Sequence, residues 1–375
     1  MDVLRAANAL AAGGARVLHL EVGQPSSGAP EPVLRAAALA LAEDRLGYTD
    51  ALGVEKLRRR IALHYGEAYR IDLDWQRVAV TGGSSGGFVL AFLAAFDAGQ
   101  RVAVGVPGYP AYRNILSALG VDVVRLPLDE STRFQPTPAM LDDLVRRVGR
   151  IDGLIVASPA NPTSSMLDGT ALAALAGWCR EQGTRLISDE IYHGIAFAGR
   201  AETALSFGND AIVVNSFSKY YAMTGWRIGW LVLPERLRRA IECLAQNLYI
   251  SPPSLSQHAA IGAFDCAAIL DRHVDRYAAN RAVLLDALPR AGFRRLAPAD
   301  GAFYLYAELG ENDPDSAEVS RLLLEEACVA ITPGIDFDPE RGHRFVRFSY
   351  AGETAAIEEA AARLIAWRDR HCSRA

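Results

Sequence analysis

Near the middle of the chain stands the stretch Ala211-Ile212-Val213-Val214-Asn215-Ser216-Phe217-Ser218-Lys219, in which an apolar, β-branched run ends in hydroxyls and a lysine. A short apolar run of this kind is typical of a strand that is buried on both faces. Lysine ammonium groups are strongly hydrated and seldom buried, so Lys219 is not placed as an ordinary surface charge would be. We interpret it as a lysine that forms a Schiff base.

Similar runs alternate with helical patterns from about residue 77 onward. Besides 211–215, we expect strands at Arg77–Val80, Arg101–Val106, Val121–Leu126, Gly153–Ala157, Arg185–Ser188 and Gly229–Val232. Strands separated by helices indicate βαβ crossovers and therefore a largely parallel sheet that is covered on both faces. The predicted fold class is α/β, with a mostly parallel seven-stranded sheet between helices. Ligands of such sheets bind outside the carboxyl ends of the strands.

The last part of the chain has a different pattern, which predicts a smaller α+β domain. Pro252-Pro253 interrupts a helical region, and a long helical pattern from about 268 to 288 leads to Gly292-Phe293. Beyond it we expect strands at 302–307 and 344–348 and helices at 316–327 and 355–368. We predict three segments: an N-terminal arm with part of the small domain (1–40), a large domain (41–285) and a small C-terminal domain (286–375).

The composition is that of a globular protein, with 50% hydrophobic and 22% charged residues and a formal net charge of −5. No basic cluster or zinc-finger spacing is present, which argues against a nucleic-acid partner. No signal-peptide core and no apolar run of about eighteen residues occurs, so we expect no membrane association. The 5 cysteines form neither a CxxC pair nor a dense framework, which indicates reduced thiols in a cytoplasmic protein.

Several polar motifs fall at predicted strand ends or turns. They are Gly82-Gly83-Ser84-Ser85-Gly86-Gly87, Asn161-Pro162-Thr163, Asp189-Glu190-Ile191-Tyr192, Thr224-Gly225-Trp226-Arg227 and Gly301-Ala302-Phe303-Tyr304. Each has an ordinary alternative when taken alone: a glycine-rich turn, an Asn-Pro turn or a helix-capping aspartate. Taken together, and over nearly the full length, they resemble the class I/II aminotransferase family of fold type I pyridoxal-phosphate enzymes.

This resemblance implies pyridoxal 5′-phosphate as the cofactor of the large domain, held by Lys219 as an internal aldimine. Lys219 would then carry a proton between the substrate Cα and C4′ of the cofactor. Asp189 would face the pyridine nitrogen and keep it protonated. Tyr192 and Asn161 would bind the phenolate oxygen, although a core tyrosine and a turn asparagine would look the same in the sequence.

The resemblance also assigns the cofactor's phosphate and ring. Backbone N–H groups and the dipole at a helix start suit an anion, so Ser84 and Ser85 are candidates, and Ser216, Ser218 and Arg227 complete the phosphate site by resemblance. Tyr109 stands where the family stacks an aromatic ring on the pyridine, although a turn tyrosine is the alternative. Tyr48 matches the family tyrosine that reaches the phosphate of the partner subunit, which implies a homodimer with shared active sites.

Substrate binding is assigned to Arg347, Gly23 and Asn161. A guanidinium binds a carboxylate through two parallel hydrogen bonds, although a cross-strand salt bridge is the alternative for Arg347. Gly23 would let the backbone approach the same carboxylate. His193 follows the Asp-Glu-Ile-Tyr motif and is treated as structural. No metal site is expected.

Some residues depart from the family pattern. Ala160 and Ser164 replace a common asparagine and glycine, which affects only the loop. Dicarboxylate-specific relatives carry an arginine from the neighbouring subunit in the region that here contains 246–250, Gln-Asn-Leu-Tyr-Ile. Recognition of a side-chain carboxylate by that route is therefore not expected.

The predicted activity is ping-pong transamination between an L-amino acid and a 2-oxo acid. A lyase or decarboxylase on the same scaffold is the first alternative, because the cofactor stabilises carbanions formed by several bond cleavages. A non-catalytic regulatory module built on this fold is the second.

Overall fold

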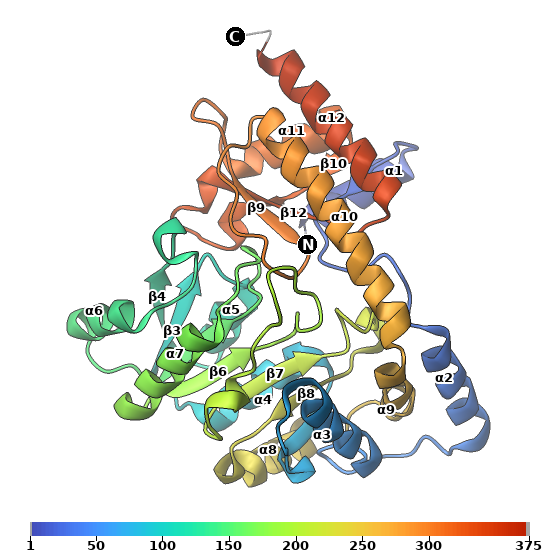
Figure 1. The fold of residues 1–375 in the computed structure, drawn as a ribbon, viewed down its shortest axis with the longest axis vertical. Helices are drawn as coiled ribbons and strands as arrows, with labels where there is room; N and C mark the ends of the chain where they lie inside the picture. Colours follow the sequence, from blue (N-terminus) through green and yellow to red (C-terminus); the bar gives the residue numbers. More distant parts are fainter. Residues whose placement is uncertain (1, 373–375) are drawn as a thin grey trace.

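The computed structural model describes residues 2–372 and confirms the α/β class, with a seven-stranded sheet and a second, smaller sheet (Figure 1). The large sheet has the order β2-β8-β7-β6-β5-β3-β4. Its strands are β2 (Val78–Thr81), β3 (Arg101–Val106), β4 (Asp122–Pro127), β5 (Gly153–Ala157), β6 (Arg185–Asp189), β7 (Ile212–Ser216) and β8 (Gly229–Val232). Every predicted run is a strand, and its bounds differ by one residue at most.

Strand β8 is the exception to the parallel pattern. It pairs antiparallel with both β2 and β7, whereas the other neighbouring strands run parallel. Helices follow most of the strands: α3 (Glu55–Tyr69), α4 (Gly83–Ala95), α5 (Pro110–Ala118), α6 (Pro138–Val148), α7 (Gly169–Gln182), α8 (Glu235–Leu248) and α9 (Ser254–Ile261). These βαβ connections bring the carboxyl ends of β3, β5, β6 and β7 to one edge of the sheet.

Two apolar cores lie on opposite faces of this sheet. Successive side chains of a strand point to opposite faces, so Val213 packs in the core that contains residues of α3, α6 and α7. Its neighbours Ile212 and Val214 pack in the other core, together with residues of α4, α5 and α8. A strand covered in this way needs apolar side chains at every position, which explains the uninterrupted apolar run in the sequence.

The smaller part of the molecule is built on an antiparallel sheet with the order β11-β12-β9. It contains α10 (Ala267–Arg290), β9 (Tyr304–Glu308), α11 (Ser316–Ala327), β10 (Val329–Ala330), β11 (Thr332–Pro333), β12 (Phe345–Ser349) and α12 (Thr354–Cys372). The strand predicted at 302–307 was wrong at its start. Ala302 has a left-handed backbone with φ of 53° and donates its N–H to the Ile195 carbonyl, so the chain turns there before β9 begins.

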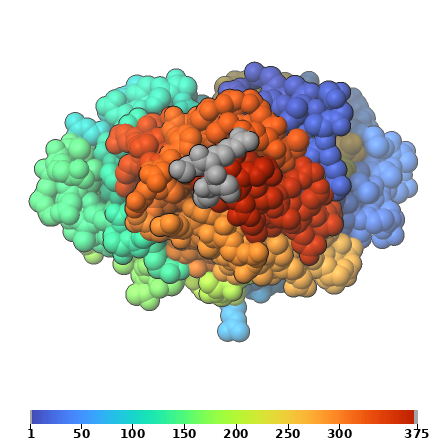
Figure 2. Space-filling model, turned by 90° about the horizontal axis from the view of Figure 1, so that it is seen from above, coloured from blue at the N-terminus to red at the C-terminus, as the bar shows by residue number. Residues whose placement is uncertain are grey.

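The start of the N-terminal segment packs on this smaller part. The segment consists of α1 (Asp2–Ala12), β1 (Leu18–His19) and α2 (Glu31–Glu43); β1 pairs parallel with β10, whereas α2 packs against α9. Seen from above, the dark blue N-terminal segment lies beside the orange and red C-terminal quarter of the chain (Figure 2). This arrangement brings residues 20–24 beside β12, since Ser349 donates its backbone N–H to the Leu20 carbonyl. None of the helices within residues 2–372 is long and apolar enough to cross a bilayer.

Candidate active site

A cavity of about 620 Å³ lies between the carboxyl ends of β5 and β6 and the small antiparallel sheet. It is lined by all the predicted site residues except Tyr48 and Ser216, namely Gly23, Ser84, Ser85, Tyr109, Asn161, Asp189, Tyr192, Ser218, Lys219, Arg227 and Arg347. The fold therefore brings together residues that are as much as 324 positions apart in the chain, as Gly23 and Arg347 are.

Lys219 lines this cavity, three residues beyond the end of β7. Its Nζ donates a hydrogen bond to the Gly23 carbonyl oxygen at 2.5 Å. Burial lowers the pKa of Lys219 to about 8, and the positive charges of Arg347 and Arg227 act in the same direction. With such a pKa, roughly one amine in ten is unprotonated at pH 7, far more than for a free lysine. An amine in this state can act as a nucleophile and as a base.

Asp189 is the last residue of β6 and is buried in the wall of the cavity. Burial raises its pKa to about 6, although hydrogen bonds from the Tyr112 hydroxyl and the Ile191 N–H favour the charged form. Tyr112 is a site residue that the sequence analysis missed. It lies on α5 three positions after Tyr109, so the two rings share one face of the helix start, and this spacing was the available signal.

One end of the cavity suits a phosphate. The buried Ser84 lies in the first turn of α4, where free backbone N–H groups and the helix dipole favour an anion. Gly83 there has φ of +76°, and an added Cβ would lie 2.4 Å from a terminal nitrogen of Arg227, so the guanidinium sits directly against the helix start. The Ser218 hydroxyl lines the cavity, and Ser216 Oγ lies 2.9 Å behind it.

The opposite end suits a carboxylate. Arg347 on β12 is only 6% exposed, and no acidic residue among 2–372 forms an ion pair with it, so the cross-strand salt bridge is absent. Its guanidinium donates to Asn161 Oδ1 at 2.9 Å and to the Glu21 carbonyl oxygen at 2.6 Å, while its Nε has no partner. A buried guanidinium without a counter-charge is costly, so the site is complete only with an anion bound.

The residues between these two ends are aromatic. Tyr192 and Tyr304 join their hydroxyl groups at 2.7 Å, and burial raises the pKa of Tyr192. Tyr109 packs edge-on against Tyr112 at the rim. Position 23 has to be glycine, because an added Cβ would lie 1.7 Å from the Tyr304 hydroxyl oxygen.

His193 and Tyr48 lie outside the cavity. His193 is buried between the Tyr69 hydroxyl, at 2.7 Å, and the Ser158 carbonyl oxygen, at 3.0 Å, which agrees with a structural role. Tyr48 is 83% exposed. The backbone beside it contacts the start of α9, where the Ser254 hydroxyl donates to the Gly47 carbonyl.

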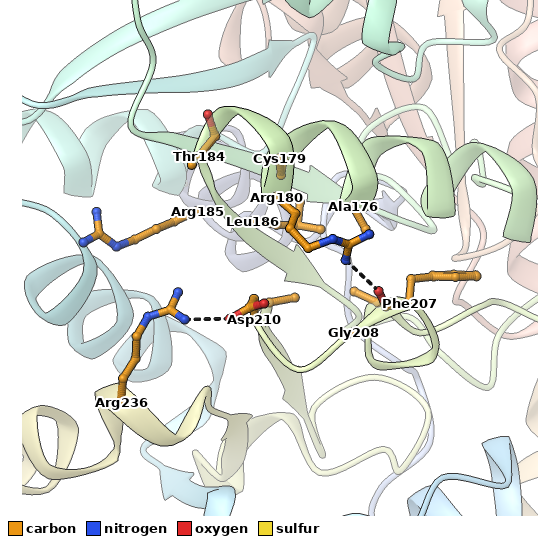
Figure 3. Close-up of a pocket in the computed structure, with 13 residues that line it drawn as sticks. Ala176, Cys179, Arg180, Thr184, Arg185, Leu186, Phe207, Gly208, Asp210 and Arg236 are labelled. Carbon is orange, nitrogen blue, oxygen red and sulfur yellow. Dashed lines mark hydrogen bonds and ion pairs between the residues drawn. The ribbon is translucent and has the colours of Figure 1, made fainter.

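A second cavity, of about 230 Å³, lies at the opposite edge of the sheet, near the first residues of β6 and β7 (Figure 3). Arg180, Arg185 and Arg236 line it; Arg236 is paired with Asp210 at 2.6 Å and Arg180 donates to the Phe207 carbonyl. None of the predicted site residues lines this second cavity, so we place the chemistry in the first cavity.

The chain belongs to the family described as aminotransferase class I and II, whose model matches residues 15–364. Enzymes of this family depend on pyridoxal phosphate, and the chain is an aminotransferase of this class. It is 52% identical to the valine–pyruvate aminotransferase of Mycobacterium tuberculosis over 94% of this chain and 91% of that relative.

Solved structures agree with this assignment. A crystal structure of an aminotransferase from Mycobacterium tuberculosis matches with a TM-score of 0.96 and 51% identity, over 99% of this chain and 96% of that one. The aspartate aminotransferase of Thermus thermophilus, with maleate, matches with a TM-score of 0.91 and 28% identity, over 97% and 95% of the two chains.

Proposed function

We propose that this aminotransferase transfers the amine of valine, or of a similar neutral amino acid, to pyruvate, in two half-reactions at the Lys219 cavity. The observation that carries the proposal is the buried Lys219 amine, with a pKa of about 8, between the carboxylate of Asp189 and two guanidiniums. The choice of valine and pyruvate rests on the likeness to the Mycobacterium tuberculosis relative of that name.

The residues of the cavity fit pyridoxal phosphate. Arg227, Ser84, Ser85, Ser216 and Ser218 would hold its phosphate at the start of α4. Asp189 would face the pyridine nitrogen, Tyr109 would cover the ring, and Tyr192 and Asn161 would bind the phenolate oxygen. When bound there, the cofactor supplies a protonated ring that accepts electrons from the bond broken at the substrate Cα.

The protein's own part is to bind, orient and move a proton. Arg347 would bind the α-carboxylate through two hydrogen bonds, which fixes the Cα–H bond relative to the ring. The carbonyl of Gly23 holds Lys219 Nζ close to the same place. Lys219, once displaced from the cofactor by the substrate amine, would take the proton from Cα and deliver it to the C4′ atom. Clamping the carboxylate near the ring plane favours this step over decarboxylation.

We further propose a cytoplasmic homodimer in which Tyr48 of one subunit reaches the phosphate site of the other. Tyr48 is 83% exposed, and Leu248, Tyr249 and Ile250 nearby in the fold are each about half exposed, which leaves an apolar surface open on this chain. A large domain at 41–285 and a small domain at 286–375, with the arm 1–40, would then share the cavity.

A single-turnover experiment tests the proposal. The cofactor-loaded protein is mixed with valine and no acceptor, and the bound product is followed by absorbance. We expect one equivalent of pyridoxamine phosphate and one of 2-oxo acid per subunit, and no signal with Lys219→Ala. Loss of carbon dioxide, or continuous release of ammonia without an acceptor, would instead support the lyase or decarboxylase alternative.

A further inference from the structure

Glu21 is a buried carboxylate in the wall of the cavity that the proposed reaction leaves without a role. Its side chain is only 4% exposed, and Oε1 lies 2.8 Å from Nδ1 of His19. The second oxygen, Oε2, has no hydrogen-bond partner among residues 2–372. A buried carboxylate oxygen left unpaired is costly, so its retention in a ligand cavity needs a reason.

The position of Glu21 relates it to the substrate. Its carbonyl oxygen accepts hydrogen bonds from Arg347 Nη2 at 2.6 Å and from the Thr332 hydroxyl at 2.9 Å. The residue thus lies directly behind the guanidinium that would hold the α-carboxylate. Glu21 also lines the cavity in which the amino acid would bind.

The other charged side chains of the cavity wall also disfavour a second negative charge on the substrate. The cations that line the cavity are Lys219, Arg227 and Arg347, and each has a task in the proposed reaction. The remaining charged groups of the lining are acidic: Glu21, Asp189 and, on an exposed turn, Asp336. Apolar side chains of Val3, Leu4, Val22 and Phe337 complete the same region. An anionic side chain of a substrate would meet like charge and no free cation.

We propose that Glu21 is a specificity residue that excludes amino acids and 2-oxo acids with an anionic side chain and admits those with a neutral one. This inference rests on the proposed transamination. At an effective dielectric of about 20, two like charges that approach within about 8 Å repel each other enough for a discrimination on the order of tenfold to hundredfold. Substrates with a neutral side chain are then selected because those with an anionic side chain are repelled, in addition to any apolar contact that the cavity makes.

Glu21 would have a different signature if it acted only through Arg347. Weakened carboxylate binding would lower the rate for every donor by the same factor, because each donor carries the same α-carboxylate. A charge filter changes only the ratio between donors that differ in side-chain charge. The pairs asparagine and aspartate, and glutamine and glutamate, differ in charge with almost the same shape.

The test measures the second-order rate constant of the first half-reaction for both donor pairs and for valine, from the absorbance of the bound cofactor at high enzyme concentration. For the wild-type protein we expect the neutral member of each pair to react at least tenfold faster. In Glu21→Gln the neutral-to-acidic ratio should fall about tenfold, while the rate with valine stays within threefold. An unchanged ratio, or an equal loss for all donors, would overturn the inference.

Two further variants serve as second test and control. Asp336→Asn, on an exposed turn, should lower the same neutral-to-acidic ratio by a smaller factor. If Glu21→Gln fails to fold, the test rests on this ratio and on the wild-type ratios, and an Asp336→Asn ratio equal to that of wild type would count against the inference. Glu318→Gln removes an exposed carboxylate of α11 outside the cavity lining and should leave the ratio unchanged. If none of the donors reacts, the proposed function is wrong as well. If donors react but the neutral-to-acidic ratio is unchanged in the variants, only this inference is wrong.

Discussion

Replacing Tyr112 with phenylalanine should weaken cofactor binding through Asp189. The Tyr112 hydroxyl donates to Oδ2 of Asp189, and the Ile191 N–H donates to Oδ1 at 3.1 Å. The ring of Tyr112 packs edge-on against Phe88 and Tyr109, with centroids 5.1 and 5.4 Å away, and phenylalanine preserves these contacts. The change therefore removes one of the two donors that stabilise a buried carboxylate and leaves the packing in place.

The size of the effect follows from the hydrogen bond. A hydrogen bond to a charged group contributes about 1.5–3 kcal/mol, which corresponds to a rise of roughly one to two units in the pKa of Asp189. Starting from a pKa of about 6, Asp189 would change from mostly charged at pH 7 to half charged or less. Since the carboxylate form attracts the protonated pyridine, we expect cofactor affinity to fall by the cost of deprotonating Asp189, about twofold to tenfold at pH 7 and more at pH 6.5.

The assay is a titration of cofactor-free protein with pyridoxal phosphate at several pH values. Because the lost affinity reflects the cost of deprotonating Asp189, the defect of Tyr112→Phe should shrink as the pH rises from 6.5 to 8.5. Tyr350→Phe is the matched control, since that buried hydroxyl faces the Ala302 carbonyl outside the cavity. An affinity within twofold of wild type at pH 6.5, or a defect that does not change with pH, would refute the assignment of Tyr112.

Two more predictions concern titrating groups. The rate at which added pyridoxal phosphate becomes attached to Lys219 should rise with pH, with a midpoint near 8, because only the free amine reacts. Arg347→Gln should move this midpoint upward, toward 10.5, because it removes a positive neighbour. Stopped-flow absorbance measures both midpoints, and a rate that does not change with pH contradicts the prediction. Burial raises the pKa of Glu190 from 4.5 to about 8. Between these pH values the folded protein holds a proton that the unfolded chain has lost. The contribution of Glu190 to the free energy of unfolding should therefore fall as pH rises, by up to about 1.4 kcal/mol per pH unit. Between pH 7 and 8 the buried histidines contribute little, while Lys219, whose pKa is lowered to about 8, adds an opposite slope to both proteins. The slope of the unfolding free energy against pH, measured with urea, should therefore be more negative in wild type than in Glu190→Gln; equal slopes would count against a protonated Glu190.

The strands of the large sheet were predictable because a strand that is buried on both faces needs a continuous apolar run, and such runs are visible in the sequence. Runs such as 153–157 and 229–232 agree with the structure at both ends. The strand order was not predictable, since β8 lies between β2 and β7 only because of long-range packing. The pairing of Leu18 with Val329 was likewise not predictable from the sequence. Nothing in the two-residue strands Leu18–His19 and Val329–Ala330 specifies a partner about three hundred positions away.

The sequence placed at one edge of the sheet those candidate residues that directly follow strands, whereas Tyr112 and Glu21 were missed. Asp189 and Lys219 come at or just after strand ends, and parallel strands bring such positions to one edge. Tyr112 and Glu21 have no such marker. The partner of Tyr112 lies 77 positions away, and Glu21 faces the cavity only because the N-terminal segment lies beside β12. Contacts of this kind depend on the packing of whole elements, which local patterns do not encode.

The arrangement of charge in the cavity would keep the two anions of the proposed complex from exchanging places. Arg227 lies against the start of α4, where the helix adds partial positive charge, and this end suits a phosphate with its higher negative charge. Arg347 is held by Asn161 and by the Glu21 carbonyl, so two of its nitrogens are already oriented and a planar carboxylate fits the remaining edge. The acidic side chain of Glu21 then lies at the carboxylate end alone. A ligand with a second carboxylate would be repelled there, whereas the phosphate, at the far end, would not.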